Sequence, residues 1–341
     1  MNPILKKWNQ LPWHLHTNCV KFLSFKTRMR LREVSKLNKK IAEAAPKHHF
    51  DSVKVEMDIT YQPSVVCVEG AWVTVRIEQR RRGRKTRAFV GKVRHFTAQL
   101  LKFAVIDDFE YGDKFETDQD ASEFLSKISN VTAINFESLK LEIENIDVIK
   151  AILEKCETVE NLVLEAVGFA RNGVEMIDVF QFDSLCRAKH VQLKNLSMPS
   201  IPLKLVESWI RNDAELGTTL QVFFINCRNH GYFAPPENIE KRIIFNEPPR
   251  LRLRTDNIAK HIIIREIDEP GRRNKITEHF VSFTVIPATQ KRLEYETNDR
   301  WTHKYIIDRR NRELIQLHSA MRDHTLESTE PIVDGFLNLR N

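Results

Sequence analysis

The sequence predicts an α+β protein, and three features of its hydrophobic patterning lead to that fold class. Near the N-terminus, apolar residues recur at helical spacing between Leu11 and Ile41. In the middle of the chain, short apolar runs alternate with amphipathic segments at a regular interval. Toward the C-terminus, β-rich runs are separated by turn residues. We therefore expect a small three-helix unit, then an irregular α/β array, then C-terminal antiparallel strands.

The first helix is expected to begin at Pro12, because the fixed φ of proline suits the first turn of a helix. Ser24 and Ser35 are candidate N-caps, so two further helices are expected near Phe25 and Lys36. A unit of about 40 residues is rarely stable on a core of its own. We therefore expect another protein to complete it, although a generic helical start to some other domain also fits this pattern.

The string LPWHLHTNCVKFLSFKTRMRLREVSK resembles the F-box, register for register and without a gap. The Leu-Pro that opens that motif falls on Leu11 and Pro12. Two positions depart from it: Arg28 stands where the family usually has an apolar residue, and Asn38 where it often has Trp. The resemblance implies that residues 8–48 dock a Skp adaptor through an apolar anchor set. That set is Leu11, Pro12, Leu15, Val20, Leu23, Leu31 and Val34.

A β-rich region is expected over residues 50–130. Strands are predicted at 53–59, 64–69, 72–78 and 87–93, where β-branched and aromatic residues gather between turn residues. An acidic segment, 107–120, is read as an exposed loop before a helix at 121–128.

One dense basic run interrupts this region: Arg80, Arg81, Arg82, Arg84 and Lys85, around Gly83. Three interpretations stay open, namely a solvated hairpin tip, a nuclear-import signal and a loop that contacts phosphate. Together with the formal net charge of +7, the run motivates an alternative function, a nuclear nucleic-acid-binding protein.

The middle of the chain, 131–230, holds a repeat. Apolar runs begin at Ile134, Leu162, Val191 and Leu220, so that one starts every 28 or 29 residues. Amphipathic segments lie between them, at 146–155, 174–182 and 203–211. A strand and a helix at this interval are typical of leucine-rich-repeat solenoids, which stack parallel strands. We therefore expect an irregular leucine-rich-repeat-like array, and two unrelated βαβ units are the alternative.

The C-terminal region, 231–320, returns to strands, which are expected as hairpins over 243–245, 258–267, 278–286 and 304–308. The stretch HIIIREIDEPGRRNKITEHFVSFTVIP resembles the F-box-associated region of nematode F-box families. Residues 321–341 are expected to form a tail.

Composition and motifs argue against several classes of protein. Hydrophobic residues make up 42% of the chain, and no apolar run suggests a membrane span. The N-terminus lacks the apolar stretch of a secretory signal, so we expect a cytoplasmic and/or nuclear protein. The five cysteines indicate neither a disulfide framework nor a metal site. The adjacent His48 and His49, with Asp51 nearby, lack a second ligand cluster, and we read both as solvated histidines. We therefore expect no metal and no cofactor.

No catalytic motif is present, so an enzyme is not expected. What the F-box resemblance implies instead is a substrate-recognition adaptor of an SCF-type E3 ubiquitin ligase. Its partners would be a Skp adaptor, through it a cullin-RING complex, and a protein substrate of unknown identity, with no membrane and with nucleic acid as the less favoured partner. Candidate substrate-binding residues point outward from the array and its loops: Glu165, Lys194, Asn226 and Arg228.

Overall fold

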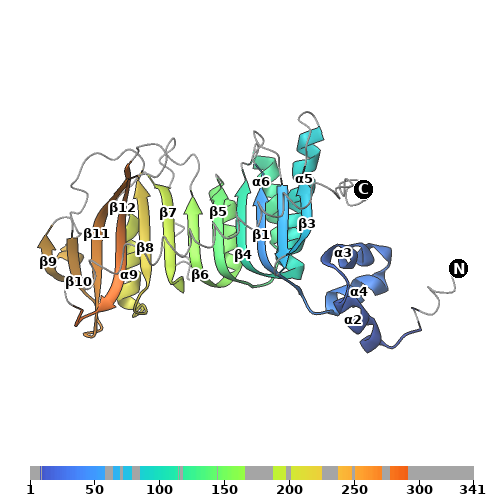
Figure 1. Ribbon diagram of the computed structural model, residues 1–341, viewed down its shortest axis with the longest axis horizontal. Coiled ribbons are helices and arrows are strands. Elements are labelled where there is room, and N and C mark those ends of the chain that lie inside the picture. The colour runs from blue at the N-terminus through green and yellow to red at the C-terminus, as the bar shows by residue number, and fades with distance from the viewer. Residues whose placement is uncertain are drawn as a thin grey trace.

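A computed structural model shows an elongated molecule, with helices α2, α3 and α4 at one end of a long sheet (Figure 1). The structure describes residues 8, 10–57, 64–69, 72–78, 85–113, 115, 118–143, 145–165, 187–196, 201–224, 237–247, 250–270 and 277–290. Three predicted segments lie outside these residues: the helix at 174–182, the strand at 304–308 and the tail at 321–341.

The three N-terminal helices begin where their caps predict. They are α2 (Trp13–Lys21), α3 (Phe25–Val34) and α4 (Lys36–Ala44). The Ser24 side chain accepts a hydrogen bond from the backbone N–H of Thr27, and the Ser35 side chain accepts one from that of Asn38. Both predicted N-caps are therefore confirmed.

The strands form one twelve-stranded mixed sheet, ordered β3-β2-β1-β4-β5-β6-β7-β8-β12-β11-β10-β9. Their bounds are β1 (His48–Glu56), β2 (Ser64–Glu69), β3 (Trp72–Glu78), β4 (Ala104–Asp113), β5 (Ile134–Ile143), β6 (Cys156–Glu165), β7 (His190–Leu196), β8 (Thr219–Phe224), β9 (Ile243–Glu247), β10 (Arg250–Arg254), β11 (Lys260–Pro270) and β12 (Thr277–Pro287). From β1 through β4 to β8 neighbouring strands are parallel, and at both ends of the sheet they are antiparallel.

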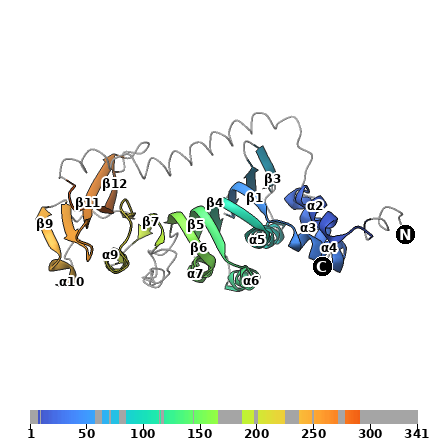
Figure 2. The ribbon, with the colours of Figure 1, turned by 90° about the horizontal axis from the view of Figure 1, so that it is seen from below.

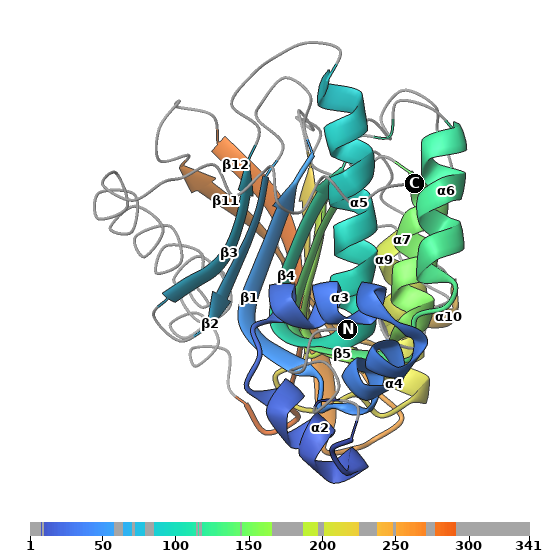
Figure 3. The ribbon, with the colours of Figure 1, turned by 90° about the vertical axis from the view of Figure 1, so that its right-hand side faces the viewer.

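In the described part of the chain, helices α5, α6, α7 and α9 cover one face of this sheet, as the views from below and from the end show (Figures 2 and 3). Their bounds are α5 (Lys85–Phe103), α6 (Asp118–Ile128), α7 (Ile146–Lys155) and α9 (Ile201–Arg211). A further short helix, α10 (Glu237–Glu240), precedes β9. The main core lies between these helices and the sheet, where Ile152 of α7 and Trp209 of α9 are each 1% exposed.

The repeat forms parallel neighbouring strands, as its spacing predicts. Leu162, Val191 and Leu220 stand directly opposite one another on β6, β7 and β8. The fourth predicted member differs, because Leu139 rather than Ile134 stands opposite Leu162. Ile134 pairs with Cys156 at the start of the next strand. This aligned row lies on the helix-covered face and is fully buried there.

Two segments of the β-rich region differ from the expectation. Residues 87–93 are not a strand but the first half of α5, whose buried Val90, Val93 and Leu100 recur at helical spacing. The acidic segment is not one loop, since its first half belongs to β4 and its end to α6. In β4, Asp113 is buried because the Arg94 side chain of α5 donates two hydrogen bonds to it, of 2.8 and 2.9 Å.

The basic run lies between β3 and a helix, so it is not the tip of a hairpin. Lys85 opens α5, and the other four cations of the run lie outside the described residues. At the other end of the chain, the expected strands 258–267 and 278–286 form a hairpin, β11 and β12, but it continues the same sheet, because β12 pairs with both β11 and β8. Sequence analysis missed β10, which is the short alternating segment RLRLR.

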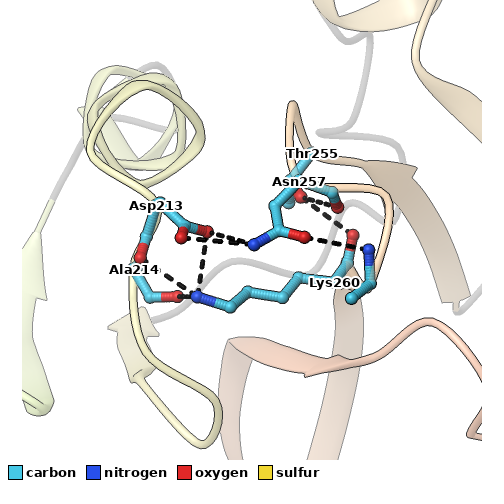
Figure 4. Close-up of polar contacts among 6 residues, drawn as sticks. Asp213, Ala214, Thr255, Asn257 and Lys260 are labelled. Carbon is cyan, nitrogen blue, oxygen red and sulfur yellow. Dashed lines mark hydrogen bonds and ion pairs between the residues drawn. The ribbon is translucent and has the colours of Figure 1, made fainter.

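A cluster of hydrogen bonds and an ion pair joins the turn after α9 to the loop between β10 and β11 (Figure 4). Nζ of Lys260 lies 2.9 Å from Oδ1 of Asp213 and donates to the backbone carbonyl of Ala214 at 3.0 Å. The amide nitrogen of Asn257 also donates to the Asp213 carboxylate. Asp213 has a positive φ of 51°, which a short polar residue tolerates. This cluster connects the parallel strands to the terminal hairpins.

Candidate functional site

The N-terminal helical unit, made of α2, α3 and α4, has a small core of its own. Val20, Ile41 and Ala45 are buried at its centre, with three partly buried residues around them: Trp8, Leu23 and Leu31. Val20 and Ile41 are each 0% exposed, so little of this core is left for a partner to touch. Val20, one of the predicted anchors, therefore supports the surface of the unit rather than forming it.

Arg28 explains the first departure from the F-box pattern. Its guanidinium is buried and donates hydrogen bonds to three backbone carbonyls, those of Lys21, Leu23 and Pro46. The Leu23 bond is 3.1 Å long. Carbonyls at the end of a helix have no partner within it, and an arginine fork can satisfy several of them at once. Arg28 thus connects the end of α2 to the segment that enters β1.

Asn38 explains the second departure. Its side-chain oxygen accepts a 3.0 Å hydrogen bond from Nε1 of Trp8, which lies 30 residues earlier in the chain. The Trp8 ring also makes an edge contact with His16, at 4.6 Å between centroids, and the Trp8 carbonyl lies 2.7 Å from Nε2 of His16. The F-box family often has a Trp at the position of Asn38. In this chain an indole also lies beside that position, but it belongs to Trp8.

Apolar side chains on the outside of the helical unit form its candidate docking surface. They are Leu11, Trp13, Leu15, Phe22, Val34 and Leu37, all at least 36% exposed. Leu15 lies in α2, Leu11 and Phe22 flank that helix at helical spacing from Leu15, and Phe22 is 80% exposed. Exposed apolar residues gathered on a small unit typically mark an interface.

The predicted anchors fall into three groups on this unit. Leu11, Pro12, Leu15 and Val34 are exposed, Leu23 and Leu31 are half-buried, and Val20 is buried. Trp13, Phe22 and Leu37 are exposed as well but were not among the predicted anchors. Helical spacing from Leu11 and Leu15 was the signal that could have found Phe22.

The helical unit is joined firmly to the sheet, because a residue of α3 is part of the main core. Phe25 of α3 is 1% exposed and belongs to the main core. Its ring lies 5.5 Å from that of Phe50 and 5.8 Å from that of Phe96. Arg32 of the same helix donates to Gln99 of α5 at 2.9 Å, and its guanidinium stacks 3.8 Å from the centre of the Phe103 ring.

His48 belongs to the same junction and is not a solvated histidine. Its side chain is 15% exposed, its ring lies 4.8 Å from that of Phe50, and its Nε2 forms a close contact with the Glu69 carboxylate. The junction between helical unit and sheet is therefore aromatic in its centre and charged at its edges.

The sheet face opposite the four helices, named here the polar face, carries a row of alternating charges. Lys54, Glu110 and Lys140 stand side by side on β1, β4 and β5. The lysine Nζ atoms lie 3.5 and 2.7 Å from Oε1 of Glu110. Burial alone would raise the pKa of Glu110, but the nearby Lys140 and Lys54 outweigh it and hold this pKa below the ordinary value.

A second row on the polar face contains two of the predicted substrate-binding residues. Glu142, Glu165 and Lys194 stand opposite one another on β5, β6 and β7. Nζ of Lys194 lies 3.8 Å from Oε2 of Glu165. Burial, and after it the charge of Glu165, raise the pKa of Glu142. Glu165 and Lys194 are thus partly exposed neighbours, whereas Asn226 and Arg228 lie outside the described residues.

Farther along, the polar face is buried. Gln192 and Gln221 are 5% and 6% exposed, and their side-chain amides are joined by a 2.9 Å hydrogen bond. Arg252 is 8% exposed and donates to His261 and to backbone carbonyls near residue 288. In the half of this face that runs from β1 to β7, the side chains of Glu142, Glu165 and Lys194 are accessible.

The described residues contain no helix with both the length and the apolar character needed to cross a membrane. A comparison with protein families matches residues 8–49 to the F-box domain. No curated protein and no solved structure matches the chain significantly. In general, F-box domains bind the Skp adaptor of SCF ubiquitin ligases, and the proteins that carry them are typically non-catalytic subunits.

Proposed function

We propose, from the premise that this chain is an F-box protein, that it is the substrate-recognition adaptor of an SCF-type E3 ubiquitin ligase. The F-box domain at residues 8–49 would dock a Skp adaptor and, through it, a cullin-RING complex. The rest of the chain would hold a protein substrate in the cytoplasm and/or nucleus. The partners would supply the catalysis. The observation that carries this proposal is the F-box domain itself, folded as three helices with an exposed apolar surface.

The docking surface in this proposal differs from the expected anchor set because it includes Phe22 and leaves out Val20. Leu11, Leu15 and Phe22 would contact the partner together, since all three are exposed and lie in or next to α2. Buried anchors of this kind dominate interface energy, and truncating one costs about 2 kcal/mol or more. Val20 would act indirectly, through the helix packing that keeps the anchors in place.

The parallel strands and helices would form a leucine-rich-repeat-like array. The supporting observation is the alignment of Leu162, Val191 and Leu220 on adjacent parallel strands, with α7 and α9 on the same side. The terminal hairpin of β11 and β12 would be the F-box-associated region of a nematode-type F-box protein. Its antiparallel pairing from Lys260 to Pro270 agrees with that assignment.

The substrate would bind the accessible half of the polar face and the loops at its edge. Glu165 and Lys194 lie there, and Asn226 and Arg228 follow the last parallel strand in sequence. Carboxylates and lysines stand side by side on this face, which suits a protein surface of mixed charge better than a nucleic-acid backbone. Phosphate binding by the Arg80–Lys85 run would instead support the nucleic-acid alternative, which a steep salt dependence of DNA binding would reveal.

Capture of a purified Skp adaptor by the full chain tests the docking half of the proposal. The double variant Leu11→Ala/Pro12→Ala, and separately Phe22→Ala, should each weaken capture at least about 30-fold. Val105→Ala is the matched control, because Val105 is also an exposed apolar residue but lies on β4. Circular dichroism shows whether each variant is folded. Undiminished capture by the folded double variant would contradict the assignment.

Affinity purification from cells, followed by mass spectrometry, tests the substrate half. Lys194→Glu should lose bound substrate while it keeps the Skp adaptor, because Lys194 is remote in sequence and structure from the helical unit (Figure 1). Substrate that stays bound to Lys194→Glu but is lost when residues 240–341 are removed would place the site on the terminal strands.

A further inference from the structure

Three side chains with metal-binding atoms meet where the sheet begins, next to the F-box domain. They are His49 and Asp51 of β1 and Asp107 of β4, and one ligand atom from each lies within 4.8 Å of the others. Nε2 of His49 is 3.0 Å from both carboxylate oxygens of Asp107, a residue 58 positions later in the chain. In sequence, His49 and Asp51 form only half of a site. The fold supplies the missing ligand.

The pairing of two parallel strands produces this meeting. Phe50 stands opposite Ile106 and Ser52 opposite Asp108, which leaves Asp51 and Asp107 side by side between them. In β1 two residues separate the core residues Phe50 and Val53, and in β4 two residues separate Ile106 and Phe109. The usual alternation of buried and outward residues is therefore interrupted at the same level in both strands. Asp51 and Asp107 each directly follow a core residue, Phe50 or Ile106, and both carboxylates therefore lie outside the core.

The donor set is mixed, and this separates it from an ordinary group of acidic side chains. An imidazole nitrogen with two carboxylates suits a first-row divalent metal ion, above all Zn²⁺, whereas Ca²⁺ and Mg²⁺ prefer oxygen ligands alone. Three protein ligands leave a coordination position for water. His49 and Asp107 are 53% and 39% exposed, so a hydrated ion can reach them.

We propose that His49, Asp51 and Asp107 form a binding site for a divalent transition-metal ion, with zinc as the preferred ion. Bound there, the ion would crosslink β1 and β4 just after the segment that connects the F-box domain to the sheet. The neighbouring residues His48 and Phe50 pack against Phe25 of α3, so the site borders the junction of the two parts of the molecule. This site stands independently of the ubiquitin-ligase function.

The test uses the metal alone, added to the full chain after treatment with a chelator. We expect one equivalent of Zn²⁺ to bind in calorimetry and to raise the melting temperature, because ligands that bind the native state stabilise it. Co²⁺, used as a coloured substitute, should give an absorption band that Zn²⁺ removes. His49→Ala, Asp51→Asn and Asp107→Asn should each weaken Zn²⁺ binding by about tenfold or more.

Two matched controls separate the site from general surface binding. His14→Ala removes another exposed histidine and Glu157→Gln another exposed carboxylate, and neither should change Zn²⁺ affinity. The three site variants should melt like the wild-type chain when no metal is present, since their side chains lie outside the core. The proposal is overturned if the wild-type chain binds neither Zn²⁺ nor Co²⁺, or if His49→Ala binds them as tightly as the wild type.

Discussion

Trp8 and Asn38 are joined by a 3.0 Å hydrogen bond from the indole N–H to the side-chain oxygen, across 30 residues of sequence. Asn38 is 6% exposed, and its amide would be costly to bury without a partner. The pair closes the N-terminal helical unit, because Trp8 precedes α2 and Asn38 lies in α4. The unit therefore depends on a residue that precedes the Leu-Pro of its motif.

Replacing Trp8 by Phe should keep most of the ring packing but remove the donor. We expect the free energy of unfolding to fall by about 1–3 kcal/mol, the cost of a buried acceptor without its hydrogen bond. Urea denaturation measures it. Trp13→Phe is the control, since Trp13 is 48% exposed in the same unit and should change stability by less than about 0.5 kcal/mol. Equal losses in the two variants would argue against the role of the hydrogen bond.

Phe25 and Phe22 form a matched pair on either side of the α2–α3 turn. Phe25→Ala should lower the free energy of unfolding by about 3–5 kcal/mol, because Phe25 is 1% exposed and fills the main core. Phe22→Ala should change stability by less than about 0.5 kcal/mol, because Phe22 is 80% exposed, yet it should weaken binding of the Skp adaptor. Thermal unfolding and adaptor capture measure the two effects. A stable Phe25→Ala chain would show that the helical unit and the sheet fold independently.

Leu162 lies inside the row of aligned core residues and is 0% exposed. Leu162→Ala should therefore cost about 2–4 kcal/mol, through lost burial and the cavity that remains. Val105→Ala, on the exposed side of β4, serves as the control and should be nearly neutral. A nearly neutral Leu162→Ala in denaturant unfolding would be inconsistent with the packing described.

Glu110 gives stability a defined dependence on pH. Its pKa is lower in the folded chain than its ordinary value of 4.5, since Lys140 and Lys54 offset the effect of burial. A carboxyl group whose pKa is depressed by folding stabilises the native state above its unfolded pKa, and this stability is lost as the pH falls through its folded pKa. Glu110→Gln should therefore destabilise the chain at pH 7, by about 1–3 kcal/mol.

Below pH 4.5 the difference between wild type and Glu110→Gln should shrink, since the wild-type carboxylate is then progressively protonated. Urea unfolding across pH 3–7 would show this convergence. Glu157 is an exposed residue on β6, and Glu157→Gln is the control. Its free energy of unfolding should differ from that of the wild type by the same amount at every pH. If the wild type stays more stable than Glu110→Gln by the same free energy down to pH 3, the ion-pair explanation is contradicted.

Local chemistry was enough to predict several elements from sequence. Ser24 and Ser35 cap helices because their hydroxyls satisfy the backbone N–H groups of the next turn. The apolar spacing of residues 146–155 predicts the bounds of α7, and the β-branched runs at 64–69 and 72–78 predict β2 and β3. The F-box motif is readable for the same reason, since its residues lie close together in the chain.

Hydrophobic periodicity did not predict the type of every element correctly. Residues 87–93 were expected as a strand because they are rich in β-branched and aromatic residues, yet Val90 and Val93 belong to a long helical face that reaches Leu100. A short window could not show that face. Asp113 was expected in a loop because the segment 107–120 is acidic and contains a glycine, yet it is buried.

Only the tertiary structure decided which distant residues meet. Asp113 is buried because Arg94 and the hydroxyl of Tyr111 bind it. His49 faces Asp107 because β1 and β4 are parallel neighbours. A hydrophobic pattern determines which side of an element is buried, but not which other element covers that side. The sequence by itself thus determined the helical motif and the repeat, whereas packing between elements far apart in the chain decided the junction, the continuous sheet and the composition of the candidate sites.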